Sequence, residues 1–244
     1  MLDVGAGDGL IAFGALELVG SSGRVIFSDV SGPLLDHCRT LADEAGVAGR
    51  CQFVLAGAED LSQIETASVD AVTTRSVLIY VLDKRRAFAE FYRVLRTGGR
   101  ISICEPINAL TFPEPPDELF GFDVSPIRHI ADRVKAGYSE LRGPEPAMMG
   151  FDDRDLLAMA EAGHFAEIHL ELHRQVATER RPKSWDAFLS SSPNPLAPTW
   201  AEVIERAVAT QERRQLEAYL RPLVESGERR LRLATAHLWA EKPV

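Results

Sequence analysis

The sequence predicts an α/β fold built on a doubly wound, mostly parallel sheet, and three observations carry this prediction. Over the first hundred of 244 residues, short apolar runs alternate with helical patterns, as in strand–helix–strand units. The first run leads into three alternating glycines, an arrangement in which a strand turns into a helix beside a ligand. The composition, 45% hydrophobic and 26% charged residues, is that of a globular chain with a full core.

Two patterns define the elements of the first half. Five short apolar runs are expected as strands: residues 2–4, 24–29, 52–56, 69–74 and 100–105. Residues 31–46 predict a helix with Ser31 as its N-cap. Residues 83–99 predict another, with an apolar stripe and the pair Gly98-Gly99 at its end. These elements make residues 1–106 the predicted cofactor-binding core.

The composition changes after residue 106, and four further segments are expected. Residues 107–150 are rich in proline and aromatic side chains and predict a lid insertion. Residues 151–177 predict a core helix and a half-solvated edge strand with alternating polarity. Residues 178–230 predict a helical cap insertion, and residues 231–244 a closing strand. We expect both insertions to pack together over the carboxyl ends of the strands.

Charge and composition exclude several classes of function. A net charge of −9 disfavours nucleic acid, because phosphate contacts need clustered Lys and Arg. No apolar stretch could span a bilayer and no signal segment precedes residue 2, so we expect a cytoplasmic protein without a membrane partner. The three cysteines form no C-x-x-C pair, and we predict no metal site. The oligomeric state stays open, a dimer included.

The glycine loop indicates which ligand this edge binds. Gly5, Gly7 and Gly9 are spaced G-x-G-x-G, so they depart from the dinucleotide pattern G-x-G-x-x-G. Asp3, just before the loop, would repel a pyrophosphate and attract an ammonium group. Asp29 ends the second strand, where a carboxylate can accept both hydroxyls of a ribose. The ligand should therefore have a ribose, a cationic amino-acid end and no phosphate, and S-adenosylmethionine is such a ligand.

Class I S-adenosylmethionine-dependent methyltransferases have successive motifs that this chain resembles in order and spacing: LDVGAGDG, IFSDVS, AGAEDL, VDAVTTRSVLIYV and RVLRTGGRISICEP. The resemblance covers residues 1–106. It is nearest to the menaquinone-biosynthesis-type branch (methyltransferase type 11), which acts on small molecules. It implies a Rossmann-like, seven-stranded sheet whose last strand is antiparallel, a place that residues 231–242 fit. It also implies S-adenosyl-L-methionine as the cofactor and a small-molecule acceptor.

The resemblance also implies roles for individual residues at the cofactor. The residues expected there are Gly5, Gly7, Arg75 and Ser76, beside Asp3, for the methionine portion, Asp29 for the ribose, and Val30, Ala58 and Glu59 for the adenine. One position departs from the family, which commonly has an Asp before the Ala-Glu pair to accept from the adenine amino group. That place is Gly57 here, so either the cofactor binds more weakly or Glu59 or Asp60 substitutes for the Asp.

The expected reaction is an in-line displacement that moves the methyl group to a small organic acceptor. The lid predicts a hydrophobic acceptor through its apolar and aromatic residues Phe112, Phe120, Phe122, Tyr138, Met148 and Met149. Where the acceptor is a hydroxyl or an acidic carbon, a base is also needed. His129 in the lid helix and Tyr80 after the fourth strand are the two candidates for this catalytic residue.

Three alternatives remain at this point. Tyr80 and Lys84 form Y-x-x-x-K, the pair of an NAD(P)-dependent Rossmann oxidoreductase, although the glycine pattern of that family is missing. His169 and His173 share a strand face and could hold a metal, but an exposed edge strand explains them as well. A non-catalytic S-adenosylmethionine-binding protein or a truncated paralogue is the third. Relatives of this type have helices before their first strand that cover the cofactor. Here, either residues before Met1 belong to a longer chain, or residues 107–150 and 178–230 provide the cover instead.

Overall fold

The computed structural model describes residues 1–142, 146–194 and 197–244, and the chain divides into two units. The first, which we call the sheet unit, comprises Met1–Leu110, Pro146–His173 and Ala234–Val244. The second, the helical unit, comprises Thr111–Glu145 and Arg174–Leu233. No described helix is both long enough and apolar enough to cross a bilayer.

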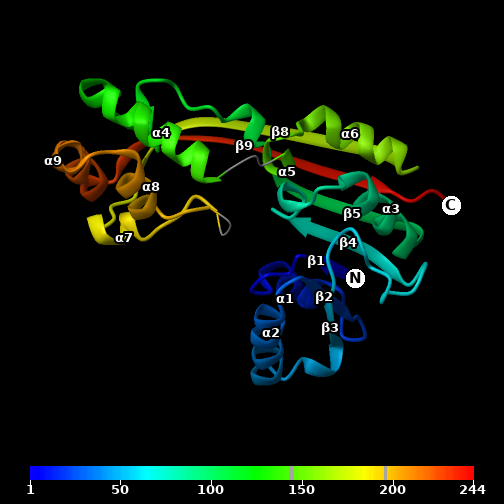
Figure 1. Cartoon of the computed structure of the whole chain (residues 1–244). Coiled ribbons are helices and arrows are strands. Elements are labelled where there is room, and N and C mark those ends of the chain that lie inside the picture. The colour runs from blue at the N-terminus through cyan, green and yellow to red at the C-terminus, as the bar shows by residue number, and fades with distance from the viewer. Residues whose placement is uncertain (143–145, 195–196) are drawn as a thin grey trace. The chain divides into compact units, whose positions relative to one another are not determined.

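The sheet unit is built on seven strands in the order β3-β2-β1-β4-β5-β9-β8 (Figure 1). β1 pairs in parallel with β2 and β4, β2 with β3, and β4 with β5, whereas β9 pairs antiparallel with β5. The strands are Leu2–Val4, Val25–Asp29, Cys51–Leu55, Val69–Arg75, Leu95–Pro106, Ala166–Arg180 (β8) and Glu228–Glu241 (β9). This topology confirms the predicted doubly wound, mostly parallel sheet with an antiparallel last strand.

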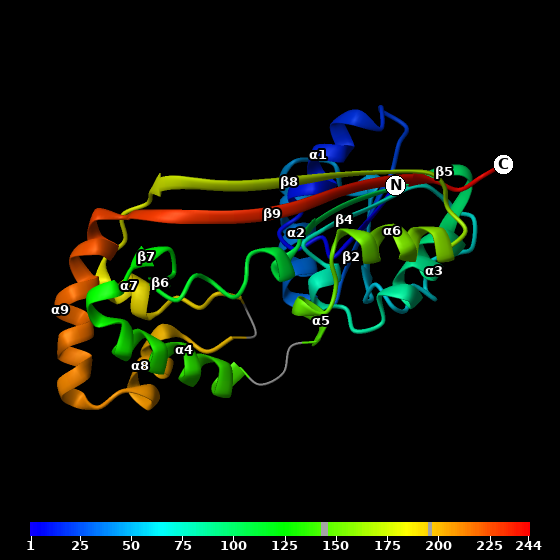
Figure 2. The same ribbon diagram turned by 90° about the horizontal axis from the view of Figure 1, so that it is seen from above.

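Helices cover both faces of this sheet because strands buried on both sides need two apolar layers (Figures 1 and 2). α1 (Leu10–Leu18) and α2 (Gly32–Glu44) pack with β2 around Phe27. α3 (Lys84–Val94) and α6 (Asp153–Ala162) pack on the opposite face, against strand residues such as Ile101. The expected N-cap of α2 is present, since Ser31 accepts from the Leu34 N–H. Asp152 forms a capping box on α6.

The helix predicted over residues 83–99 ends earlier than expected. α3 stops at Val94, and Leu95 begins β5 instead of a further helical turn, so Gly98-Gly99 does not end the helix. The reason lies in the pairing of the sheet. The Gly98 N–H donates to the Lys242 carbonyl, and the Lys242 N–H donates to the Gly99 carbonyl, both at 2.8 Å. The ladder with β9 therefore takes the backbone groups that a longer helix would have used.

The helical unit joins the two insertion segments in one core. Its helices are α4 (Arg128–Arg142), α7 (Trp185–Leu189), α8 (Trp200–Ala207) and α9 (Thr210–Ser226), beside a hairpin of β6 (Glu118–Leu119) and β7 (Phe122–Asp123). Trp200 is 6% exposed, and its ring centroid lies 3.7 Å from that of Phe120 and 5.2 Å from that of Tyr138. α4 and α8 approach closely, because a Cβ on Gly137 would lie 2.5 Å from the Cβ of Ala207.

Candidate functional site

The carboxyl ends of the five parallel strands carry most of the predicted site residues, beginning with the loop after β1. Gly5, Gly7 and Gly9 have φ angles of +70°, +57° and +86°, a region that other residues rarely adopt. The Gly5 and Ala6 N–H groups donate to the Ser28 carbonyl at 2.7 and 2.9 Å. A Cβ on Gly5 would lie 2.3 Å from Cγ2 of Val77, whereas one on Gly7 would meet nothing within 4 Å. The loop is thus packed at Gly5 and open at Gly7.

Asp29 fixes the open part of this loop from the end of β2. It is 7% exposed; its Oδ2 accepts from the Gly7 N–H at 2.9 Å and its Oδ1 from the Ser31 N–H at 2.8 Å. A carboxylate offers about four lone-pair sites, so two remain for further donors such as ribose hydroxyls. Asp29 therefore orders the glycine loop and keeps acceptor capacity at the same edge.

Asp3 lies deeper, on β1 itself. It is 2% exposed, and its Oδ1 accepts from the Thr73 hydroxyl at 2.7 Å. Burial raises the pKa of Asp3 to about 6, and the negative charge of Asp29 adds to this increase. The predicted role of Asp3, attraction of an ammonium group, thus falls on a buried carboxylate below the loop.

The predicted adenine-binding residues lie after β2 and β3. Val30 is 78% exposed and Ala58 is 4% exposed. A Cβ on Gly57 would lie 3.3 Å from Cγ1 of Val30, so these two loops are in contact. The Glu59 carboxylate accepts from the Asp83 N–H at 2.6 Å, and Asp60 accepts from the Ser62 N–H at 3.1 Å. Both acids that could substitute for the missing Asp therefore already hold local backbone donors.

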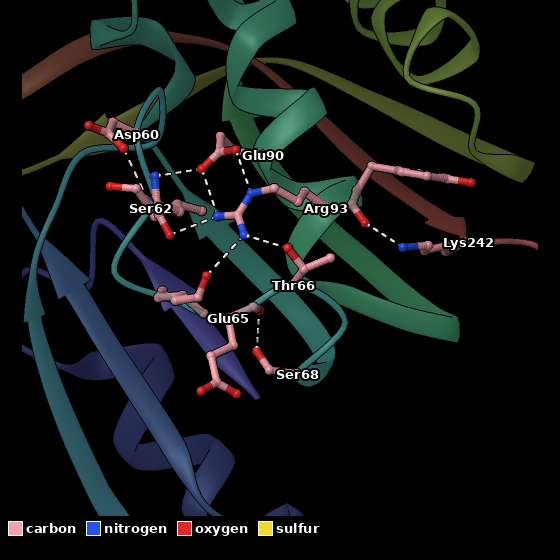
Figure 3. A network of polar contacts seen from close by, with 11 residues as sticks. Asp60, Ser62, Glu65, Thr66, Ser68, Glu90, Arg93 and Lys242 are labelled. Carbon is pink, nitrogen blue, oxygen red and sulfur yellow. Dashed lines mark hydrogen bonds and ion pairs between the residues drawn. The ribbon is translucent and has the colours of Figure 1, made fainter.

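A network centred on Arg93 holds the loop after β3 in place (Figure 3). Arg93 lies on α3, and its guanidinium donates to the Leu61 carbonyl at 2.8 Å and to the Ile64 carbonyl at 3.0 Å. Glu90 pairs with Arg93 and accepts from the Leu61 N–H at 2.7 Å, and the guanidinium keeps the pKa of Glu90 below its usual range. The loop that carries Ala58 is thereby fixed by α3.

The turn after β4 brings together Arg75, Ser76 and Tyr80. Arg75 and Ser76 are exposed, and Ser76 has a φ of +56°, which is strained for a residue with a side chain. Tyr80 ends the short 3-10 helix η2 (Leu78–Tyr80) and is 38% exposed. All three lie at the same edge of the sheet as the glycine loop.

One residue at this edge escaped the sequence analysis. Glu105, near the end of β5, is 0% exposed, and its Oε1 accepts from the Val77 N–H at 2.9 Å and the Leu78 N–H at 3.0 Å. Its motif, RISICEP, contributed to the resemblance, but the spacing of that motif gives no sign that the carboxylate reaches the turn after β4. Burial raises the pKa of Glu105 to about 7, although the hydrogen bonds oppose this increase.

The pair required by the oxidoreductase alternative is absent from the structure. Tyr80 belongs to η2 whereas Lys84 begins α3, so they do not share a helix. The Lys84 ammonium is buried, and it donates to the carbonyls of Val81 and Ala147, each at 2.8 Å. Burial lowers the pKa of Lys84. Lys84 therefore anchors the start of α3.

The histidines occupy other places. His169 stacks on Trp239 with centroids 3.9 Å apart, and His173 meets His237 edge to face at 5.3 Å. Within the described ranges, no three His, Cys, Asp or Glu side chains form a group that could hold a metal ion. His129 is exposed on α4 in the helical unit, whereas Tyr80 lies in the sheet unit. The structure therefore does not bring the two catalytic candidates together within one unit.

Comparisons with known proteins address the same part of the chain. The model of the family described as "Methyltransferase domain" matches residues 2–103. The ubiquinone/menaquinone biosynthesis C-methyltransferase UbiE of Marinomonas sp. is 35% identical over 119 residues, which are 49% of this chain and 45% of that protein. UbiE of Pseudomonas fluorescens is 37% identical over 113 residues, 45% of this chain and 44% of that protein. The chain thus spans about half the length of the curated relatives it matches.

Solved structures resemble the whole chain at low identity. The Bacillus halodurans protein BH2331 has a TM-score of 0.59 and 21% identity, with 100% of this chain and 92% of that chain covered. Geranyl diphosphate C-methyltransferase from Streptomyces coelicolor, solved with geranyl diphosphate and S-adenosyl-L-homocysteine, has a TM-score of 0.53 and 16% identity, with 99% and 70% covered. At such identities the likeness concerns the fold.

Proposed function

We propose that this chain, whose residues 2–103 match the methyltransferase-domain family, is a class I S-adenosylmethionine-dependent methyltransferase of the menaquinone-biosynthesis type and transfers a methyl group from S-adenosyl-L-methionine to a small organic acceptor. One observation carries the proposal beyond the family match. Asp29 ties down the glycine loop through the Gly7 N–H and keeps acceptor capacity, while the Gly7 Cα faces open space. A ribose and a methionine chain fit such an edge.

The cofactor would be held by the residues at the carboxyl ends of β1 to β4. Gly5 and Gly7 line its methionine portion, with Asp3 below and Arg75 and Ser76 beside it. Asp29 accepts from the ribose hydroxyls, Val30 packs on the adenine face, and Ala58 and Glu59 meet the adenine edge through their backbone. Because the carboxylates of Glu59 and Asp60 already accept from Asp83 and Ser62, the adenine amino group is recognised mainly by backbone atoms.

The cofactor supplies an activated methyl group, and the chain supplies alignment and exclusion of water. An in-line displacement at a sulfonium creates no large new charge, so near-attack geometry is the main contribution. Where the acceptor is a hydroxyl or an acidic carbon, we propose His129 or Tyr80 as the base. If His129 is the base, His129→Ala should lower kcat and remove the dependence of kcat on pH; if Tyr80 is the base, Tyr80→Phe should do so. In either case the cofactor affinity should stay unchanged.

We also propose a hydrophobic acceptor, although fewer residues support it than the sequence suggests. Phe120, Phe122 and Tyr138 belong to the core of the helical unit, and Met148 packs in the core of the sheet unit. Of the apolar residues that suggested the acceptor, Phe112 is the one with a large exposed surface, at 50%. Support comes from relatives such as geranyl diphosphate C-methyltransferase, whose named substrate is an isoprenoid.

Calorimetry with S-adenosylmethionine, S-adenosylhomocysteine and NAD as separate titrants tests the proposal. We expect binding of the first two, and about a tenfold weaker affinity in Asp29→Asn because a ribose acceptor loses its charge. Asp36→Asn is the matched control, since Asp36 lies on α2 and its carboxylate pairs with the exposed Arg39. NAD binding without either sulfur compound would refute the assignment.

Turnover separates an enzyme from a protein that only binds the cofactor. Transfer of a labelled methyl group to a panel of small quinones, phenols and isoprenoid diphosphates should show product with at least one acceptor. Binding without any transfer over such a panel would favour the non-catalytic alternative. We further propose that the protein works in the cytoplasm, a reducing compartment that suits its three free thiols, Cys38, Cys51 and Cys104.

A further inference from the structure

Glu105 is the only fully buried acid, at 0% exposure, among the described residues, and neither the motif comparison nor the proposed chemistry uses it. Its Oε1 accepts from the N–H groups of Val77 and Leu78, and its Oε2 lies 3.4 Å from the N–H of Ile79. Three successive backbone donors thus converge on one carboxylate, at the start of η2. This arrangement resembles an anion nest in which the anion is part of the chain itself.

The donors belong to the turn that follows β4, so Glu105 joins the end of β5 to that turn. The Thr74 hydroxyl, at the end of β4, lies 3.4 Å from the same Oε1. The Ser76 N–H donates to the Cys104 carbonyl at 2.9 Å, next to Glu105 in the chain. Backbone and side-chain contacts together therefore hold the strained residue Ser76 and the start of η2 against β5.

The contact continues from this turn to the glycine loop. The Val77 side chain packs on Gly5 so closely that a Cβ there would lie 2.3 Å from Cγ2 of Val77. Gly5 in turn donates its N–H to the Ser28 carbonyl, and the Ser28 hydroxyl donates to the Ala56 carbonyl at 3.0 Å. One continuous series of contacts thus links the carboxyl ends of β5, β4, β1, β2 and β3.

We propose that Glu105 is a positioning residue for the cofactor site: its carboxylate fixes the turn at residues 76–79, and through Val77 it fixes the glycine loop that receives the cofactor. Glu105 is too buried to touch the cofactor, so its effect passes through the two loops. The link between the two loops stands on the contacts above, whereas the binding of a cofactor at the glycine loop rests on the proposed function.

The test combines local amide exchange with binding of S-adenosylhomocysteine. In Glu105→Gln, one acceptor oxygen becomes an NH2 group that cannot accept from a backbone N–H. Amide exchange at Val77, Leu78 and Ile79 should accelerate at least about tenfold, exchange at Gly5, Ala6 and Gly7 should also accelerate, and affinity for S-adenosylhomocysteine should fall about 5- to 30-fold. Cooperative thermal unfolding of the variant establishes that it is folded.

Two further variants give the test its controls. Glu114→Gln removes a comparable contact in the helical unit, where Glu114 accepts from the N–H groups of Phe120 and Gly121, each at 2.9 Å. It should leave exchange in both sheet-unit loops and the affinity within about twofold of the native values. Val77→Ala keeps the carboxylate contacts but thins the packing on Gly5, so it should accelerate exchange in the glycine loop and spare residues 77–79. If Glu105→Gln does not fold, Glu105→Asp takes its place in the same measurements, because it keeps a carboxylate but withdraws it by one methylene from the N–H groups of Val77 and Leu78.

The outcomes distinguish failure of the positioning role of Glu105 from failure of the proposed function. Faster exchange confined to residues 77–79, or unchanged affinity despite faster exchange in both loops, would overturn the positioning role. If the native chain binds no S-adenosylhomocysteine, the proposed function fails. Exchange at Gly5 to Gly7 in the variants then decides alone whether Glu105 orders the glycine loop.

Discussion

The sheet unit and the helical unit differ in where they bury polar groups. All buried polar or charged residues of the described chain lie in the sheet unit: Asp3, Ser28, Asp29, Thr74, Lys84 and Glu105. The helical unit buries aromatic and aliphatic side chains such as Trp185, Phe188 and Trp200. Buried polar groups are costly unless they are satisfied, so the sheet unit pays this cost at the edge where we propose the cofactor site. The described core of the helical unit, by contrast, is made of apolar side chains.

The largest effect should come from the aromatic core of the helical unit. Trp200→Ala removes a side chain that packs on Phe120 and Tyr138, and we expect a loss of about 3–5 kcal/mol in the free energy of unfolding of this unit. Denaturant unfolding, followed with amide exchange in both units, measures it. Trp239→Ala is the control, because Trp239 is 38% exposed in the sheet unit and its loss should lower the stability of that unit by less than Trp200→Ala lowers that of the helical unit. Equal losses in both units would mean that they unfold as one.

Unfolding should depend on pH in the sheet unit. Burial raises the pKa of Glu105 from 4.5 to about 7 and that of Asp3 from 3.8 to about 6. At a pH between the ordinary and the raised pKa of either group, the folded state binds more protons than the unfolded state. The free energy of unfolding therefore falls as the pH rises from about 4 to 7, and Glu105 contributes roughly 3 kcal/mol to this decrease.

Neighbouring charges do not reverse this sign. Lys84, whose charge interacts with Glu105, and the adjacent Cys104 face that site, and Asp29 faces Asp3. Denaturant unfolding at pH 4.5 to 8 measures the slope, which Glu105→Gln and Asp3→Asn should each flatten. Trp239→Phe leaves only Trp185 and Trp200 as fluorophores, both in the helical unit, whose signal should show little slope. A rise in stability toward pH 7 would contradict the prediction.

A substitution in the glycine loop should abolish tight binding while sparing the helical unit. Gly5→Ala places a Cβ 2.3 Å from Val77 at a φ of +70°, so we expect affinity for S-adenosylhomocysteine to fall by about 100-fold or more. Calorimetry measures this change. Gly14→Ala, on α1 with nothing within 4 Å of a Cβ, should bind normally and gain about 0.5–1 kcal/mol of stability. Native affinity in Gly5→Ala would show that the loop is not the binding element.

The smallest effect compares one helix cap in each unit. Thr199 caps α8 by accepting from the Glu202 N–H, and Ser31 caps α2 by accepting from the Leu34 N–H at 3.4 Å. Thr199→Ala should lower the free energy of unfolding of the helical unit by about 1 kcal/mol, and Ser31→Ala should lower that of the sheet unit by no more. Thermal scans with amide exchange resolve the two. A decrease in the stability of the unit that does not carry the substitution would show that the two units do not unfold independently.

How well each element could be predicted from the sequence depends on how far apart in the chain its interacting residues lie. The strands, their parallel pairing and the glycine loop depend on short patterns, so residues 1–106 could be predicted almost element by element. The end of α3 could not, because Gly98 and Gly99 pair with Lys242, far along the chain. Glu105 and Lys84 were missed as structural anchors for the same reason. Their partners are backbone groups of distant turns, which no spacing of residues reveals.

The same limit applies to residues 107–150, which the sequence predicts to form a lid. Its aromatic residues indicated an acceptor pocket, but Phe120, Phe122 and Tyr138 pack with residues of the second insertion. A pattern of apolar residues does not tell a core from a binding surface, because both need the same side chains. The two insertions lie far apart in the sequence, and only the structure brings them into one unit.

The place of β9 between β5 and β8 sets an order on folding during synthesis. The ribosome delivers β8 before the strand that joins it to the sheet, and the whole helical segment up to Ser226 emerges in between. Throughout that interval β8 is an unpaired strand, open to pairing with another chain. Its exposed charged residues, Glu167 and Glu171 among them, disfavour such pairing until β9 arrives. The polar side of β8 therefore serves the nascent chain as much as the folded protein.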